Sequence, residues 1–130
     1  MSLPITSLTT AVCLVLLVLL GLWVAARRIK AKVRFETGGD GDLVRRVRAH
    51  GNFAEYVPFG LIALGLVEAQ GAETRFVWML AAALVGGRLA HAAGLLGKVH
   101  LLRVIGIALT FAMLLAAAWR LWSVAGPKLA

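Results

Sequence analysis

The chain has 130 residues, of which 61% are hydrophobic and only 15% charged, and its formal net charge is +8. A soluble domain averages about 25% charged residues, so this composition excludes an ordinary soluble protein and indicates an integral membrane protein. The single cysteine, Cys13, excludes an intrachain disulfide and a two-cysteine redox relay.

Four apolar stretches are long enough to cross a bilayer as helices, which takes about 20 residues each. In chain order they are residues 5–26, 43–69, 76–96 and 104–124. The segments between them are too short to form another domain. We therefore predict an all-α integral membrane protein in which residues 1–130 form one domain, a bundle of four transmembrane helices.

A hydrophobic N-terminal stretch can also be a signal peptide that is later removed. Residues 1–10 contain no lysine or arginine, and a basic cluster at 27–34 follows the apolar stretch instead of preceding it. This order is the reverse of a secretory signal. We therefore expect the first span to be retained.

The positive charges are distributed unevenly among the predicted loops. Eight lysines and arginines lie between the first span and the beginning of the second, Lys98 and Arg103 flank the third loop, and the second loop has only Arg75. The positive-inside rule then predicts a cytoplasmic first and third loop, with both termini on the non-cytoplasmic side. Basic residues in this position indicate membrane lipid headgroups as a partner and argue against nucleic acid.

The second span begins with a polar stripe. Arg48, Asn52 and Glu55 follow one another at i, i+4 and i+7, so they share one helix face, and Arg45 extends it. An ionisable side chain in hydrocarbon costs at least ~2.5 kcal/mol on insertion scales. Such a stripe indicates either a ligand site or a polar contact buried between helices.

The third span adds Arg88 and His91 at i and i+3, whereas the first and fourth spans have few polar residues. We therefore expect a pocket between the second and third spans that opens toward the basic side. The histidines have no second cysteine or carboxylate at ligand spacing, so we expect no metal site.

Two motifs and one further arginine resemble a known family. They are Arg48-x-His50-x-Asn52-x-x-Glu55-Tyr56-x-Pro58, Gly87-Arg88-x-x-His91 and Arg103. In this combination they resemble the MAPEG family, the membrane-associated proteins of eicosanoid and glutathione metabolism. The resemblance covers nearly the whole chain and is closest to small bacterial members similar to microsomal glutathione transferases. It implies a homotrimer in the bacterial inner membrane, with glutathione bound as co-substrate between subunits.

On this resemblance, the residues predicted to bind glutathione are Arg48, Asn52, Glu55, Tyr56, Arg88 and His91. Arg103 matches an arginine that stabilises the thiolate in several members, so it is the predicted catalytic residue. The residue types are consistent with glutathione binding, because arginines can bind its two carboxylates and a glutamate can bind its ammonium group. Lowering the pKa of a thiol by ~2 units requires ~2.7 kcal/mol, which a guanidinium in a poorly hydrated pocket can supply.

The chain also departs from the eicosanoid-handling members of the family. Leu95 replaces a tyrosine found in several of them, and Gly51 replaces a basic residue of the prostaglandin E synthase. The expected function is therefore a general glutathione transferase or peroxidase that acts on small hydrophobic electrophiles or lipid hydroperoxides.

Other interpretations remain open at this stage. One alternative function is a non-catalytic trimer that binds lipid or glutathione on the same fold. The position of Arg103 distinguishes the two functions. An enzyme needs this arginine in the pocket beside Arg48, whereas a binding protein can lack it there. Arg48 and Glu55 could instead neutralise one another, and Arg103 could be an interfacial anchor. A four-span drug exporter is disfavoured, because it needs a carboxylate in the first span and residues 5–26 contain none.

Overall fold

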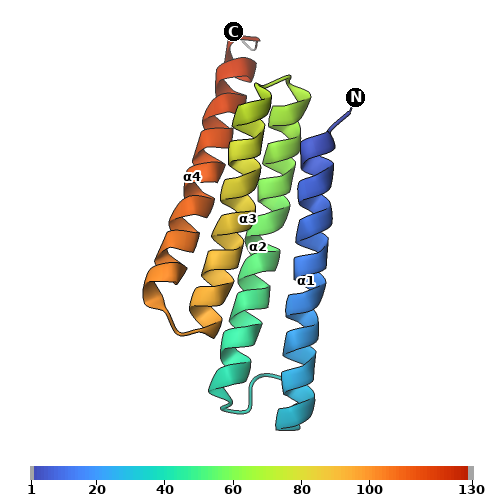
Figure 1. The fold of residues 1–130 in the computed structure, drawn as a ribbon, viewed down its shortest axis with the longest axis vertical. Coiled ribbons are helices and arrows are strands. Elements are labelled where there is room, and N and C mark those ends of the chain that lie inside the picture. Colours follow the sequence, from blue (N-terminus) through green and yellow to red (C-terminus); the bar gives the residue numbers. More distant parts are fainter. Residues whose placement is uncertain (1, 129–130) are drawn as a thin grey trace.

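The computed structural model describes residues 2–128, which form four long helices and one short turn. These are α1 (Pro4–Ala31), α2 (Gly41–Ala69), α3 (Thr74–Leu96), α4 (His100–Ala125) and the 3-10 turn η1 (Gly126–Lys128). The helices lie side by side and alternate in direction, so both ends of the chain are at one end of the bundle and the α1–α2 and α3–α4 loops at the other (Figure 1). The predicted all-α bundle of four helices is confirmed.

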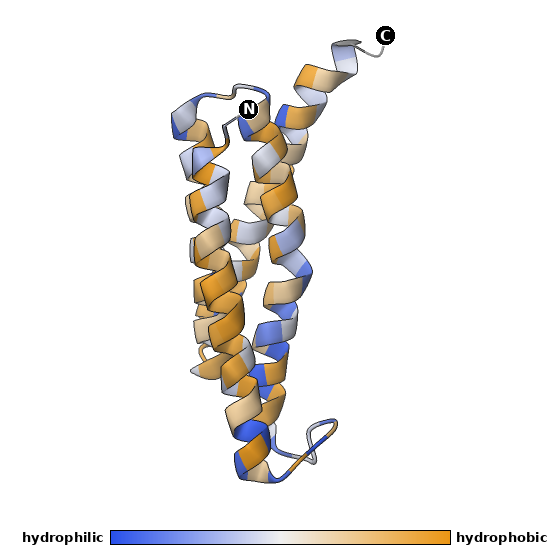
Figure 2. Cartoon of the chain, turned by 90° about the vertical axis from the view of Figure 1, so that its right-hand side faces the viewer, coloured by the Kyte–Doolittle hydropathy of each residue, from blue (hydrophilic) through white to orange (hydrophobic). Residues whose placement is uncertain are grey.

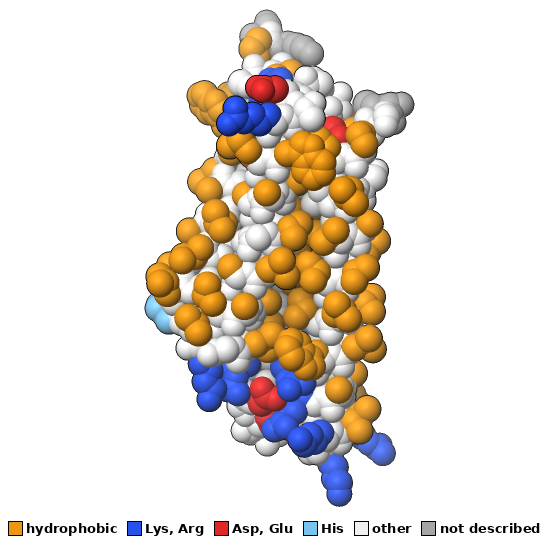
Figure 3. All heavy atoms as spheres, viewed as in Figure 1, with side chains coloured by type: hydrophobic (Ala, Val, Ile, Leu, Met, Phe, Trp, Pro, Cys, Tyr) orange, Lys and Arg blue, Asp and Glu red, His pale blue; other side chains and the backbone are white. Residues whose placement is uncertain are grey.

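The helices are arranged so that α2 and α3 lie between α1 and α4. Within residues 2–128, α1 lies next to α2 and α3, α4 lies next to α2 and α3, and the backbones of α1 and α4 do not approach one another closely. Large parts of the two outer helices therefore face outward, and their apolar side chains cover the middle of the molecule (Figure 3). The most exposed of these side chains include Val15, Leu22, Leu115, Trp119 and Trp122.

Length and composition make α1, α3 and α4 apolar enough to cross a membrane. Figure 2 shows mainly hydrophobic residues over the middle of the bundle and hydrophilic residues gathered toward its lower end. The second predicted span, α2, is the longest of the four helices at 29 residues but carries the polar stripe in its first half. The protein is therefore a multi-pass membrane protein in which α2 is the polar helix.

The α3–α4 pair is the closest helix contact, because glycines line it. A Cβ on Gly106 would lie 2.5 Å from the backbone nitrogen of His91, and one on Gly94 would lie 2.5 Å from that of Arg103. Small residues let helices in membranes approach until their backbones touch. This approach brings the backbone of α4 within reach of side chains from α3, which positions the site described below.

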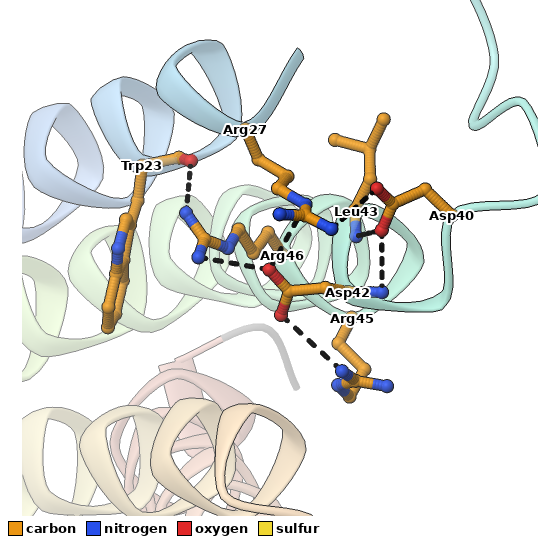
Figure 4. Close-up of polar contacts among 7 residues, drawn as sticks. All are labelled: Trp23, Arg27, Asp40, Asp42, Leu43, Arg45 and Arg46. Atoms are coloured by element: carbon orange, nitrogen blue, oxygen red, sulfur yellow. Dashed lines mark hydrogen bonds and ion pairs between the residues drawn. The ribbon is translucent and has the colours of Figure 1, made fainter. Parts of the chain in front are cut away.

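The α1–α2 connection is held by a cluster of ion pairs (Figure 4). Arg27 lies 2.8 Å from Asp40, and Arg46 lies 3.0 Å from Asp42 and donates to the carbonyl oxygen of Trp23. Asp40 also caps α2 by accepting the backbone N–H of Leu43 at 2.9 Å. This N–H bond, together with Arg27, holds the pKa of Asp40 below its usual range.

Candidate functional site

A pocket of about 460 Å³ opens between α2, α3 and α4 on the side of the basic loops. Its lining residues are Val44, Arg45, Arg48, Asn52, His91, Leu95, Arg103 and Ile107. The pocket was expected between the second and third spans, and α4 completes it. Three of its lining side chains are arginines and none is a carboxylate, so the wall is strongly positive.

A second, smaller pocket of about 270 Å³ continues the first toward the α3–α4 loop. The two share Arg45, Leu95 and Arg103, and the second adds Lys98 and His100. Together they form a basic groove that leads from the end of the bundle into the polar region of α2. A negatively charged ligand would be attracted along this groove.

The structure brings four of the predicted site residues together in the main pocket, namely Arg48 and Asn52 from α2, His91 from α3 and Arg103 from α4. Glu55, Tyr56 and Arg88 do not line it. Glu55 is exposed on the outside of α2 and makes no ion pair within residues 2–128. The carboxylate that was expected to meet the ammonium group of glutathione therefore lies at the outer surface of the single chain.

Arg88 is buried among partners from two other helices, with only 2% of its surface exposed. Its Nη1 donates to the side-chain oxygen of Asn52 at 2.7 Å, and its Nη2 donates to the hydroxyl of Thr110 at 2.7 Å and the carbonyl of Gly106 at 3.3 Å. The Nε also donates to Thr110, at 3.0 Å. The guanidinium thus joins α2, α3 and α4, and within the described chain these partners are all uncharged.

Tyr56 packs beside this arginine. The carbon at the centre of the Arg88 guanidinium lies 5.1 Å from the centroid of the Tyr56 ring, a cation–π distance. The same ring lies 5.7 Å, centroid to centroid, from Phe111 of α4. Asn52 contacts Arg88 and also lines the pocket, so it connects the buried cluster to the open site.

His91 joins α3 to the start of α4. Its Nδ1 lies 3.2 Å from the carbonyl oxygen of Arg103. A carbonyl can only accept, so Nδ1 carries the proton in this contact. The bond fixes the histidine ring and the backbone of Arg103 relative to one another at the mouth of the pocket.

Sequence reasoning missed three residues that build the site. Arg45 had been placed on the polar stripe, and its position three residues before Arg48 was the signal that could have added it to the site. In the structure its Nε is buried without a hydrogen-bond partner among the described residues. Thr110 and Gly106 carried no signal, because a threonine and a glycine are ordinary residues in an apolar helix.

The arrangement is suited to binding an anion with an apolar part. Arginines bind carboxylates through paired N–H groups, and Val44, Leu95 and Ile107 supply an apolar wall. Within residues 2–128, no group of three or more histidine, cysteine, aspartate or glutamate side chains is placed to hold a metal ion.

Comparisons with known proteins agree with the motifs. The family model described as MAPEG family matches residues 6–123. Two relatives from Escherichia coli, one of them from strain K12, both named inner membrane protein YecN, are each 33% identical over 96 residues, which is 73% of this chain and 73% of the relative. No solved structure matches the chain. Since the family model spans most of the sequence, the chain belongs to the MAPEG family.

Proposed function

We propose that the protein is a membrane-bound glutathione transferase or peroxidase. The observation that carries this proposal is the single pocket in which Arg103 of α4 lies with Arg48 and Asn52 of α2. A protein that only binds glutathione has no need of a cation beside the thiol, whereas an enzyme that forms the thiolate does. Arg103 is the proposed catalytic residue.

The charges of the pocket match those of glutathione. Arg45 and Arg48 would bind its carboxylates. The buried Nε–H of Arg45 has no acceptor among the described residues, so it can donate to the ligand. Arg103 would stabilise the thiolate. Holding the pKa of the bound thiol ~2 units below its ordinary value of ~8.5 takes ~2.7 kcal/mol, a reasonable contribution from one guanidinium in a partly dehydrated site.

The reaction would follow from the thiolate. In transfer, the thiol proton leaves, the sulfur forms a bond to an electrophilic carbon, and the leaving group departs with the bonding electron pair. In the peroxidase reaction, two glutathione molecules are oxidised to the disulfide while a hydroperoxide is reduced to an alcohol and water. A hydrophobic acceptor would pack against Leu95 and Ile107 at the pocket wall.

We also propose that the active form is a homotrimer, the assembly that the family resemblance implies. A carboxylate facing hydrocarbon is costly, and Glu55 lies exposed at the middle of α2 with no partner ion within residues 2–128. A neighbouring subunit would cover this face, and Glu55 could then reach the ammonium group of glutathione bound at the interface. The exposed apolar faces of α1 and α4 would supply the remaining contact.

For location, we propose the inner membrane, as in the name of the Escherichia coli relatives. The basic α1–α2 and α3–α4 loops would face the cytoplasm and both termini the other side, as the positive-inside rule predicts.

The first test is the ultraviolet absorbance of thiolate on adding glutathione to the purified protein at neutral pH. Wild type should give a saturable signal. Arg103→Gln should bind glutathione but lose most of the thiolate, since a restored pKa of ~8.5 leaves only a few per cent ionised. Arg48→Gln should weaken binding itself, and Arg75→Gln, at the opposite end of the bundle, is the charge-matched control.

The outcomes separate the two functions. Glutathione binding by calorimetry without thiolate in wild type would favour the alternative, a non-catalytic binding trimer. Absence of glutathione binding in wild type would overturn the enzyme and the glutathione-binding trimer alike, and would leave only the lipid-binding form of the alternative.

A further inference from the structure

The cations near the α1–α2 connection fall into two groups with different surroundings. Arg27, Arg45 and Arg46 are paired with Asp40 and Asp42. In contrast, Arg28, Lys32 and Arg34 make no ion pair within residues 2–128. These three lie along one groove of about 750 Å³, whose other lining residues are Ala25, Ile29, Val33 and Phe35.

Hydrogen bonds at the end of α1 define the shape of this groove. α1 ends in a Schellman motif. The backbone N–H of Val33 donates to the carbonyl oxygen of Arg28, and the backbone N–H of Lys32 donates to the carbonyl oxygen of Ile29. Lys32 occupies the left-handed position of the motif, with φ 54°. The Nη1 of Arg28 then donates to the carbonyl oxygen of Glu36 at 2.7 Å, which ties the loop back to the helix.

The length of α1 predicts that the groove lies at the depth of the lipid headgroups. A helix of 28 residues is about 42 Å long, whereas the hydrocarbon core is about 30 Å thick. The apolar part of α1 fills that core, so its last turn and the following loop extend past it. Beside the cations, Ile29 is 79% and Phe35 is 84% exposed, which suits side chains that insert between headgroups and acyl chains.

We propose that this groove binds the headgroup of an anionic phospholipid. Arg28, Lys32 and Arg34 would contact its phosphate, while Ile29 and Phe35 would pack against the upper part of its acyl chains. A zwitterionic lipid carries the same phosphate but brings an ammonium group that three unpaired cations disfavour. The groove is separate from the pocket of Arg48 and Arg103, so this proposal does not depend on the proposed function.

Native mass spectrometry of the full chain in detergent tests this binding, with phosphatidylglycerol and phosphatidylcholine of identical acyl chains as probes. Wild type should bind phosphatidylglycerol more tightly. Each cation near an anionic headgroup contributes about fivefold, so Lys32→Gln/Arg34→Gln should weaken phosphatidylglycerol binding by about 25-fold. Arg75→Gln/Arg120→Gln removes the same charge from the other end and should leave the affinity unchanged.

Several results would overturn the proposal. Equal affinity of wild type for the two lipids would do so, and this comparison needs no variant to fold. Equal losses in both double variants would mean that net charge alone attracts the lipid. Displacement of phosphatidylglycerol by inorganic phosphate at equal concentration, or by a short RNA, would assign the groove to a free anion or to nucleic acid instead.

Discussion

Two sets of arginines in the same half of the bundle have opposite surroundings. All five N–H groups of Arg88 have acceptors inside the chain, and its exposed fraction is only 2%. Arg48 and Arg103 are exposed, and their side chains make no hydrogen bond or ion pair within residues 2–128. An arginine in a membrane helix can therefore either hold helices together or remain available to bind a ligand. Which of the two it does depends on the hydrogen-bond acceptors around it.

The comparison predicts that Arg88→Ala has the largest effect on stability. It leaves the buried Thr110 and the half-buried Asn52 without their donor, and it removes the side chain that fills the space between three helices. We expect a loss of about 3 kcal/mol or more in the free energy of unfolding, measured by denaturant titration in detergent. Arg48→Ala is the control and should change stability by less than about 1 kcal/mol. Equal losses in the two variants would contradict the distinction.

The close α3–α4 contact can be tested at Gly106. A Cβ there would lie 2.5 Å from the nitrogen of His91 and 2.6 Å from the carbonyl oxygen of Gly87. Gly106→Ala should push the helices apart and lower the unfolding free energy by about 1–3 kcal/mol. Gly86→Ala is the control, because a Cβ there would meet nothing within 4 Å, and it should be neutral or stabilising. A similar loss of unfolding free energy in this variant would mean that the added methyl group acts in general and not through the helix contact.

Asn52 contacts the buried Arg88 and also lines the pocket of Arg48 and Arg103, so its variants can separate stability from ligand binding. Asn52→Asp keeps an acceptor for Arg88 and should preserve thermal stability. The added negative charge should weaken glutathione binding by about tenfold, equivalent to about 1.4 kcal/mol. Asn52→Leu should lower both stability and binding. Thermal unfolding and calorimetry on the same samples measure the two effects, and an Asn52→Asp variant with unchanged affinity would place glutathione away from this residue.

The smallest expected effect concerns Asp40, in the ion-pair cluster outside both regions. Its pKa is lowered in the folded state by the N–H of Leu43 and by Arg27. A lowered pKa stabilises the fold above the unfolded value of about 3.9, and this contribution is lost as the pH falls through the folded pKa. Asp40→Asn keeps a capping side chain and should show a flatter fall in melting temperature below about pH 4. An unchanged slope would assign the acid sensitivity to other carboxylates.

The polar stripe shows how far periodicity alone reaches. It correctly placed Arg48 and Asn52 on one face, because residues four apart on a helix are neighbours. It also placed Glu55 with them, yet Glu55 is exposed and does not line the pocket of the single chain, because it lies about 10 Å further along the helix axis than Arg48. Likewise, Arg88 was grouped with His91 by spacing, although one points into the helix contact and the other lines the pocket.

The sequence by itself determined the membrane class, the number and approximate bounds of the helices, the family, and which half of the bundle is polar. Those properties follow from hydropathy, span length and local motifs, which are all short-range. Only the tertiary structure decided the role of each polar residue, because that depends on acceptors from distant helices. Thr110 and Gly106 accept hydrogen bonds from Arg88 across the glycine-lined contact between α3 and α4. No sequence pattern within α3 could have predicted these partners.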